Sequence, residues 1–82
     1  MINLLEQLGR LFNKDLENPK HIYTSIIKIF KHLSFTIDSL CITVDNEVEI
    51  EFFCKKQFKS VIAIYKFDPN YNVWEVINYW VN

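Results

Sequence analysis

Residues 40–54, LCITVDNEVEIEFFC, decide the fold of this chain. Apolar and polar side chains alternate with a period of two on both sides of Asp45 and Asn46. This period is typical of strands with one buried face, and an Asp-Asn pair between two such runs favours a tight turn. The stretch therefore predicts an antiparallel β-hairpin.

The register of this hairpin follows from the rule that directly paired residues point to the same face of a sheet. A two-residue loop would set apolar residues of the first strand beside the glutamates of the second and bury those carboxylates. A three-residue loop, 45–47, instead pairs Val44 with Val48 and Ile42 with Ile50. We predict this second register, with one loop residue in the left-handed backbone conformation.

Two further segments extend the hairpin. Residues 60–67 are rich in β-branched and aromatic side chains and predict a third strand that is apolar on both faces. Residues 68–72 read DPNYN, which predicts a turn. In residues 73–81 the β-branched and aromatic content favours a strand, whereas apolar side chains at helical spacing leave a helix as the alternative.

Two amphipathic helices are expected before the hairpin. Residues 1–12 place apolar side chains at helical spacing. Asn18-Pro19 predicts the start of a second helix over 19–33, because Asn caps free amides and Pro suits the first turn. Together the elements predict the α+β class: two N-terminal amphipathic helices packed on one face of a three- or four-stranded antiparallel β-meander. A chain of 82 residues has room for one core, so residues 1–82 are expected to form a single small domain.

Composition excludes several function classes. The formal net charge of −1 excludes a role as a polyanion or polycation. Gly9 is the one glycine, which excludes glycine-rich phosphate loops. Arg10 is the one arginine, so at most one side chain could bind a phosphate group in the bidentate manner typical of arginine. Ile, Asn and Lys supply 27 of the 82 residues, a bias typical of AT-rich genomes such as those of phages and mobile elements.

The residues most able to bind a metal or act as a nucleophile form no pattern. His21 and His32 lie about three helical turns apart, and Cys41 and Cys54 are expected on opposite faces of the hairpin. We therefore expect no metal, no cofactor and no catalytic residue, and a chain that is not an enzyme. The sequence shows no signal-peptide pattern and no membrane span, so we expect two reduced thiols in the cytoplasm.

The surplus of large apolar residues predicts a binding surface. Two helices cover one face of a sheet, yet the third strand is apolar on both faces and the last segment is aromatic. We therefore expect an exposed patch near the C-terminal strands. Its Trp and Tyr side chains favour a role in binding, because these residue types dominate binding hot spots. If residues 73–81 formed a helix, it would cover that face instead. The residues expected to bind a partner are Tyr71, Trp74, Tyr79 and Trp80, with Glu49 and Glu51 beside them.

A second candidate surface is the side of the second helix that carries Lys20, Lys28, Lys31 and His32 without any acidic residue. It predicts the alternative function, a nucleic-acid-binding or regulatory module. The leading interpretation is a small cytoplasmic protein-binding inhibitor or masking protein that acts sterically. Immunity proteins and phage-encoded anti-defence proteins are examples of this size class. Another protein is the expected partner, a homodimer is possible, nucleic acid is less favoured, and no membrane is expected.

Overall fold

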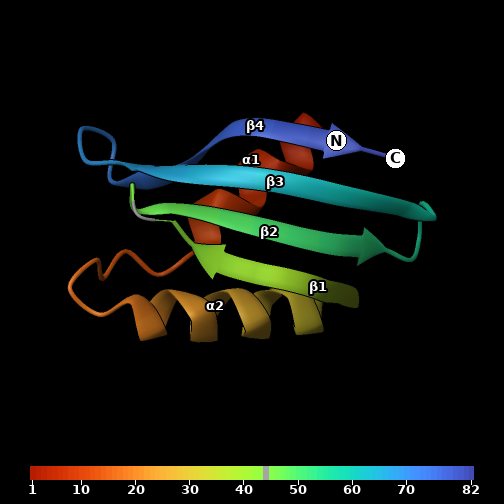
Figure 1. Ribbon diagram of the computed structural model, residues 1–82, viewed down its shortest axis with the longest axis horizontal. Helices are drawn as coiled ribbons and strands as arrows, with labels where there is room; N and C mark the ends of the chain where they lie inside the picture. The colour runs from red at the N-terminus through yellow and green to blue at the C-terminus, as the bar shows by residue number, and fades with distance from the viewer. Residues whose placement is uncertain (44) are drawn as a thin grey trace.

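The computed structural model describes residues 1–43 and 45–82. The sheet has the order β1-β2-β3-β4, and each strand pairs antiparallel with its neighbour in the chain (Figure 1). The predicted α+β meander is confirmed, and its last segment is a strand rather than a helix. The elements are α1 (Ile2–Leu11), α2 (Pro19–His32), β1 (Phe35–Ile42), β2 (Glu47–Cys54), β3 (Lys59–Asp68) and β4 (Val73–Val81).

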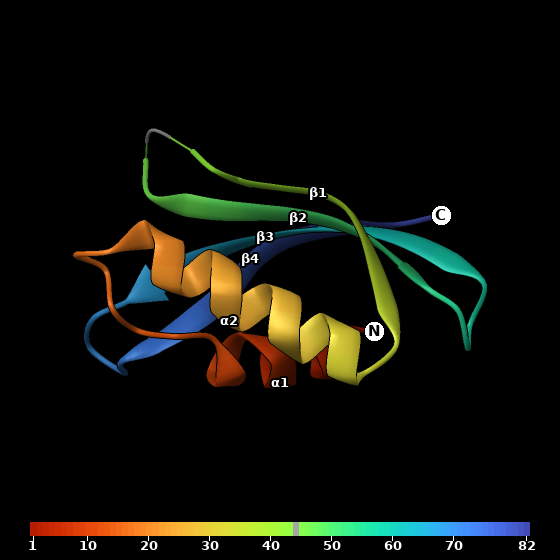
Figure 2. The same cartoon turned by 90° about the horizontal axis from the view of Figure 1, so that it is seen from below.

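Both helices lie on the same face of the sheet (Figure 2). α1 packs against β4 and α2 packs against β1, so each helix lies near one edge of the sheet. No helix or strand from residues 1–43 and 45–82 covers the opposite face. Neither helix of the described chain has the length and apolar character needed to span a membrane.

The start of α2 follows the local rules that predicted it. The side chain of Asn18 accepts a hydrogen bond from the backbone N–H of Lys20 (3.2 Å), and Pro19 occupies the first helical position. Asn satisfies an amide that the helix leaves free, and Pro has no N–H to satisfy there. The predicted N-terminus of α2 is therefore confirmed.

The predicted register of the β1–β2 hairpin is wrong by two residues. Ile42 pairs with Val48 rather than with Ile50, and Leu40 takes Ile50 as its partner. Val44, the predicted partner of Val48, lies outside the described residues. Apolar residues still oppose apolar residues, because a shift of two leaves every side chain on its own face.

The turn explains this shift. The backbone N–H of Thr43 donates to the carbonyl of Glu47 (2.8 Å), which moves the centre of the connection one residue toward the N-terminus. Asn46 has a φ of 59° and so supplies the predicted left-handed residue. A β-bulge between Ile37 and Ser39 then offsets the first part of β1 by a further residue.

The hydrophobic core lies between the helices and the sheet. Burial alternates strictly along β2, and the buried residues of β3 follow the same period of two. The ring of Phe30 in α2 packs edge-on against Phe52 in β2, with 4.9 Å between centroids. The buried core residues are Leu5, Leu8, Phe12, Ile22, Ile26, Phe30, Val48, Ile50, Phe52, Cys54, Val61, Ala63, Tyr65 and Trp74.

Tyr65 is a fully buried tyrosine whose hydroxyl ties α1 to the sheet. The hydroxyl donates to the backbone carbonyl of Leu5 (2.7 Å), and the ring packs edge-on against Phe12. Burial raises the pKa of Tyr65 well above its ordinary value, because the phenolate would lose its hydration. The contact between α1 and the sheet therefore requires the neutral hydroxyl.

We expect the free energy of unfolding to fall as the pH rises above about 10, the ordinary pKa of tyrosine. Above that pH the unfolded chain ionises Tyr65 whereas the folded chain keeps it neutral, so unfolding is favoured. Tyr65→Phe should weaken this dependence and should cost about 1 kcal/mol at neutral pH through the lost hydrogen bond. Denaturant titrations of both proteins across the alkaline range measure the difference. A difference that stays constant with pH would contradict this account.

Gly9 allows α1 to approach β4 closely. A Cβ at this position would overlap the carbonyl oxygen of Trp74 and would lie 3.1 Å from a ring carbon of Tyr65. Gly inside a helix costs up to about 1 kcal/mol relative to Ala. Gly is nevertheless the residue that fits here, because backbone atoms of β4 occupy the space that a side chain would need.

Gly9→Ala should therefore destabilise the protein, although Ala is the better helix former. The gain in helix propensity is about 1 kcal/mol, and the overlap with a backbone atom that cannot rotate away costs more. Urea unfolding should show a net loss of roughly 1–2 kcal/mol. Gln7→Ala, an exposed change in the same helix, is the control and should leave stability nearly unchanged. A Gly9→Ala variant more stable than the parent would contradict the close approach.

Candidate functional site

The face of the sheet opposite the helices is a candidate binding surface. Its side chains are those that alternate with the core residues along each strand. On β2 these side chains are all partly exposed, and they are Glu47, Glu49, Glu51 and Phe53.

Strand pairing joins these residues into rows across the open face. Glu51 lies opposite Ile62 of β3, which lies opposite Trp80 of β4. In the next row Glu49 lies opposite Ile64. Direct partners on one face have Cβ atoms roughly 5 Å apart, so carboxylates and apolar side chains are immediate neighbours here.

The apolar part of this surface is called the open-face patch, and it consists of Phe53, Ile62, Ile64, Ile77 and Trp80. Trp80 and Ile77 are each 49% exposed, and the other three are half-buried. Phe58, in the turn after β2, is 84% exposed and extends the patch, with its ring centroid 6.3 Å from that of Phe53. Bulky side chains that remain exposed on an uncovered face are typical of a surface that binds.

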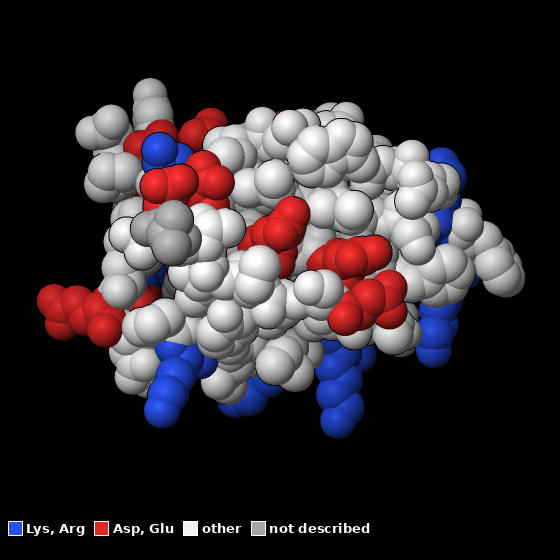
Figure 3. Space-filling model, in the orientation of Figure 1, with Lys and Arg blue, Asp and Glu red and all other residues white. Residues whose placement is uncertain are grey.

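Charge is unevenly distributed around the patch. Figure 3, which views the open face, shows acidic side chains across its middle and basic side chains mostly at its lower and right-hand borders. Glu49 and Glu51, the acidic residues predicted to contact a partner, lie on this face next to Ile64 and Ile62. Both glutamates lie on the face of β2 that sequence alternation predicts for them, because that alternation is regular in the structure.

Trp74 does not belong to this surface, and its predicted exposure is wrong. Trp74 is 3% exposed, packs against Phe67 and donates from Nε1 to the carbonyl of Asn13 (2.9 Å). A β-bulge in β4 is the cause, since Ile64 pairs with Asn78 but Tyr65 already pairs with Val76. The extra residue inverts the alternation, so Trp74 faces the helices whereas Trp80 faces away.

The two predicted tyrosines also lie away from the open-face patch. Tyr79 pairs with Ala63 and therefore lies on the helix side of the sheet, where it is 37% exposed at the edge strand. Tyr71 is exposed in the β3–β4 turn, at the end of β4 opposite Trp80. The rise per residue of a strand separates Tyr71 from Trp80 by roughly 30 Å. The four aromatic residues therefore do not form one patch.

Sequence reasoning left four members of the open-face patch without a role. Ile62 and Ile64 were expected on the second face of the third strand but were not assigned to the site. Phe53 could have been found, because it continues the alternation of Glu49 and Glu51 by one more step. Ile77 carries no sequence signal of its own, because the bulge that exposes it is a property of the strand pairing.

The free edge of β4 is partly closed to further strand pairing. Asn78 Oδ1 accepts from the backbone N–H of Tyr79 (2.9 Å), an amide that the edge would otherwise offer to a neighbouring strand. The bulge next to it bends the strand. Bulges and edge-blocking side chains prevent edge-to-edge association. The face of the sheet is therefore a better candidate surface than this edge.

Cys41 is exposed on the open face beside a carboxylate, and this arrangement opposes nucleophilic chemistry. Its Sγ lies 3.7 Å from Glu49 Oε2. Desolvation, the charge of Glu49 and this hydrogen bond all raise the pKa of the Cys41 thiol above its ordinary value. The thiolate is the reactive form, so a raised pKa lowers reactivity at neutral pH. Cys54 is buried, on the opposite face as predicted.

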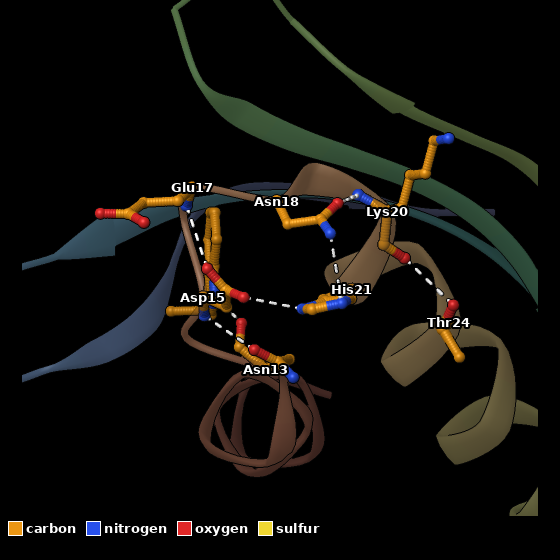
Figure 4. A network of polar contacts seen from close by, with 8 residues as sticks. Asn13, Asp15, Glu17, Asn18, Lys20, His21 and Thr24 are labelled. Atoms are coloured by element: carbon orange, nitrogen blue, oxygen red, sulfur yellow. Dashed lines mark hydrogen bonds and ion pairs between the residues drawn. The ribbon is translucent and has the colours of Figure 1, made fainter.

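His21 belongs to a polar network at the start of α2 (Figure 4). Its Nδ1 lies 2.7 Å from Asp15 Oδ2, and its Nε2 lies 3.2 Å from Asn18 Nδ2. Both ring nitrogens therefore have partners that fix the loop between the helices. No group of three or more metal-binding side chains occurs in residues 1–43 and 45–82.

The basic residues predicted to bind nucleic acid are exposed on α2, away from the open face. They are Lys20, Lys28, Lys31 and His32. His32 and Lys31 lie in the last turn, where positive charge also complements the helix dipole. A structural role therefore accounts for part of this pattern.

Comparison of the chain with models of known families, with curated proteins and with solved structures finds no match.

Truncation of the two tryptophans should destabilise the protein to very different extents. Trp74→Ala should cost about 3–5 kcal/mol, because it empties a core position and removes the contact with Asn13. Trp80→Ala should cost roughly 1 kcal/mol or less, since half of this side chain is already exposed. Urea unfolding of each variant measures both values. If Trp74→Ala leaves the protein unfolded, Trp74→Phe should still show a measurable loss. Equal losses for the two alanine variants would contradict the inversion by the bulge.

Proposed function

We propose that this chain is a small protein-binding inhibitor or masking protein that acts by covering a surface of its partner. The observation that carries the proposal is the open-face patch, which joins Trp80 and Ile77 to three half-buried apolar side chains on a face that no described element covers. Tryptophan is among the usual energetic anchors of protein interfaces, and the apolar side chains around such an anchor exclude water.

The acidic residues define the kind of partner. Glu51 and Glu49 flank the apolar rows, so a complementary protein surface would present a hydrophobic contact bordered by Lys or Arg. Nucleic acid fits this face poorly, because phosphates would meet carboxylates. The apolar residues would supply most of the affinity, whereas the carboxylates would orient the partner and speed association.

Steric masking needs no chemistry from this chain. The pKa of the Cys41 thiol is raised by its surroundings and by Glu49, and both ring nitrogens of His21 have structural partners. An inhibitor of this type occupies the surface that its partner uses for another contact. A cytoplasmic immunity protein and a phage-encoded anti-defence protein are the two forms of this function that the size and composition of the chain favour.

The nucleic-acid alternative rests on the lysines of α2, which lie outside the open face. Its support is that none of these lysines has a carboxylate partner in the described chain, where the recorded ion pair is His21–Asp15. Binding of this kind would weaken steeply with salt and would not depend on Trp80.

Affinity capture from the source cells tests the proposal. The parent chain should retain a specific protein, and the purified protein should lose its activity when the chain is added back. The double variant Trp80→Ala, Ile62→Ala should lower the affinity by about 100-fold or more, because it removes the one tryptophan of the patch together with the apolar side chain paired with it. Tyr71→Ala removes an aromatic side chain outside the patch that is even more exposed than Trp80 (80% against 49%), so it is the control and should bind normally.

Circular dichroism should show that the double variant is folded, so that a loss of binding reports the surface. Unchanged affinity in the folded double variant would refute the role of the open-face patch.

A further inference from the structure

A groove between α2 and the edge strand β1 forms a second concave surface. Its volume is about 600 Å³, within the range of sites that accept ligand groups. The groove lies at the β1 edge of the sheet and shares no residue with the open-face patch. Its principal lining residues are Ile27, Lys31, Phe35, Ile37, Leu40 and Lys55.

The floor of the groove is apolar and accessible. Ile27 projects from α2 and is 51% exposed. Ile37 and Leu40 of β1 are half-buried and point to the helix side of the sheet, opposite Phe52 and Ile50. An apolar side chain that enters from outside would therefore contact both the helix and the strand.

Two lysines flank this floor. Lys31 follows Ile27 by four residues in α2, which places the two side chains on one side of the helix, one turn apart. Lys55 enters the groove from the turn after β2. α2 contains no acidic residue, and the recorded ion pair of residues 1–43 and 45–82 is His21–Asp15. The charges of Lys31 and Lys55 are therefore available to a carboxylate from another molecule.

The edge of β1 adds backbone groups to the same groove. The bond from Thr43 to Glu47 makes these residues a hydrogen-bonded pair, and the N–H of Ile42 points outward, where it donates to the Tyr23 hydroxyl (3.1 Å). Antiparallel pairing alternates between inward and outward groups, so the N–H and C=O of Leu40 also point outward. An extended segment lying in the groove can bond to them.

We propose that this groove binds a short acidic and apolar segment of a partner protein. A bulky apolar side chain of the segment packs on Ile27, Ile37 and Leu40, and flanking Asp or Glu side chains pair with Lys31 and Lys55. The inference uses a different surface from the proposed function and stands independently of it. The apolar floor favours a peptide over nucleic acid, whose phosphates would use the lysines but leave the floor exposed to water.

Selection of a random peptide library displayed on phage against the immobilised full chain tests the proposal. The selected peptides should be enriched in Asp and Glu next to Leu, Ile or Phe. A synthetic copy of one such peptide should bind the double variant Lys31→Glu, Lys55→Glu at least about tenfold more weakly than the parent. It should also bind Ile27→Asp about tenfold more weakly, because that change places a charge on the apolar floor.

Matched controls separate the groove from other surfaces. Lys56→Glu makes the same charge change one residue away from Lys55 and should leave the peptide affinity within about twofold. Trp80→Ala should have no effect, so a failure here is distinguishable from a failure of the open-face patch. Selected peptides without acidic enrichment, no enrichment at all, or equal affinity for both groove variants would overturn the proposal. Binding of a single-stranded oligonucleotide that the double lysine variant abolishes, in place of the peptide, would overturn it as well.

Discussion

Two short helices can shield one face of a four-stranded sheet and no more, and this constraint shapes the rest of the molecule. α1 and α2 lie near opposite edges of the same face, where Gly9 and Tyr65 fix α1 against the sheet. The close approach at Gly9 brings the helix backbone down to β4 and encloses Trp74. The apolar area that a chain of 82 residues can bury is therefore concentrated on the helix side.

The uncovered face of the sheet carries apolar and acidic side chains next to one another. β3 is apolar on both sides, so Ile62 and Ile64 remain half-buried without a layer above them. Glu49 and Glu51 lie beside them and keep that face partly hydrated. Such a face is compatible with a free chain in water and can still bury apolar area against a partner. The lysines of α2 and of the β2–β3 turn lie outside the middle of this face. The net charge of −1 is therefore the sum of an acidic surface and a basic surface.

Much of the fold was predictable because local signals agreed with one another. The cap at Asn18, the helical spacing before it and the alternation in residues 48–54 all specify local geometry, and the structure follows them. The register of the β1–β2 hairpin was not predictable to the residue. Side-chain parity excludes odd shifts but permits a shift of two, and the turn at Asn46 decides between these registers.

The face on which a candidate-site residue lies was predictable in the regular strand β2. In β4 the prediction was wrong for Trp74, because that strand contains a bulge. Trp74 and Trp80 are six residues apart, which would place them on one face of an ideal strand. The bulge at Ile77 adds one residue between them and turns Trp74 into the core. A bulge depends on pairing between strands, so the sequence of β4 alone does not specify it. The groove between α2 and β1 was missed for a similar reason, since it depends on how far the helix stands from the strand.

One side of the sheet is core and the other is open, and the two tryptophans lie on opposite sides. Quenching of tryptophan fluorescence by acrylamide in the native parent chain tests this arrangement directly. We expect two populations: the fluorescence of Trp80 is readily quenched, and that of Trp74 is protected. Both should become equally accessible on unfolding in urea. A single protected population at every protein concentration would contradict the open face, and a single accessible population would contradict the burial of Trp74.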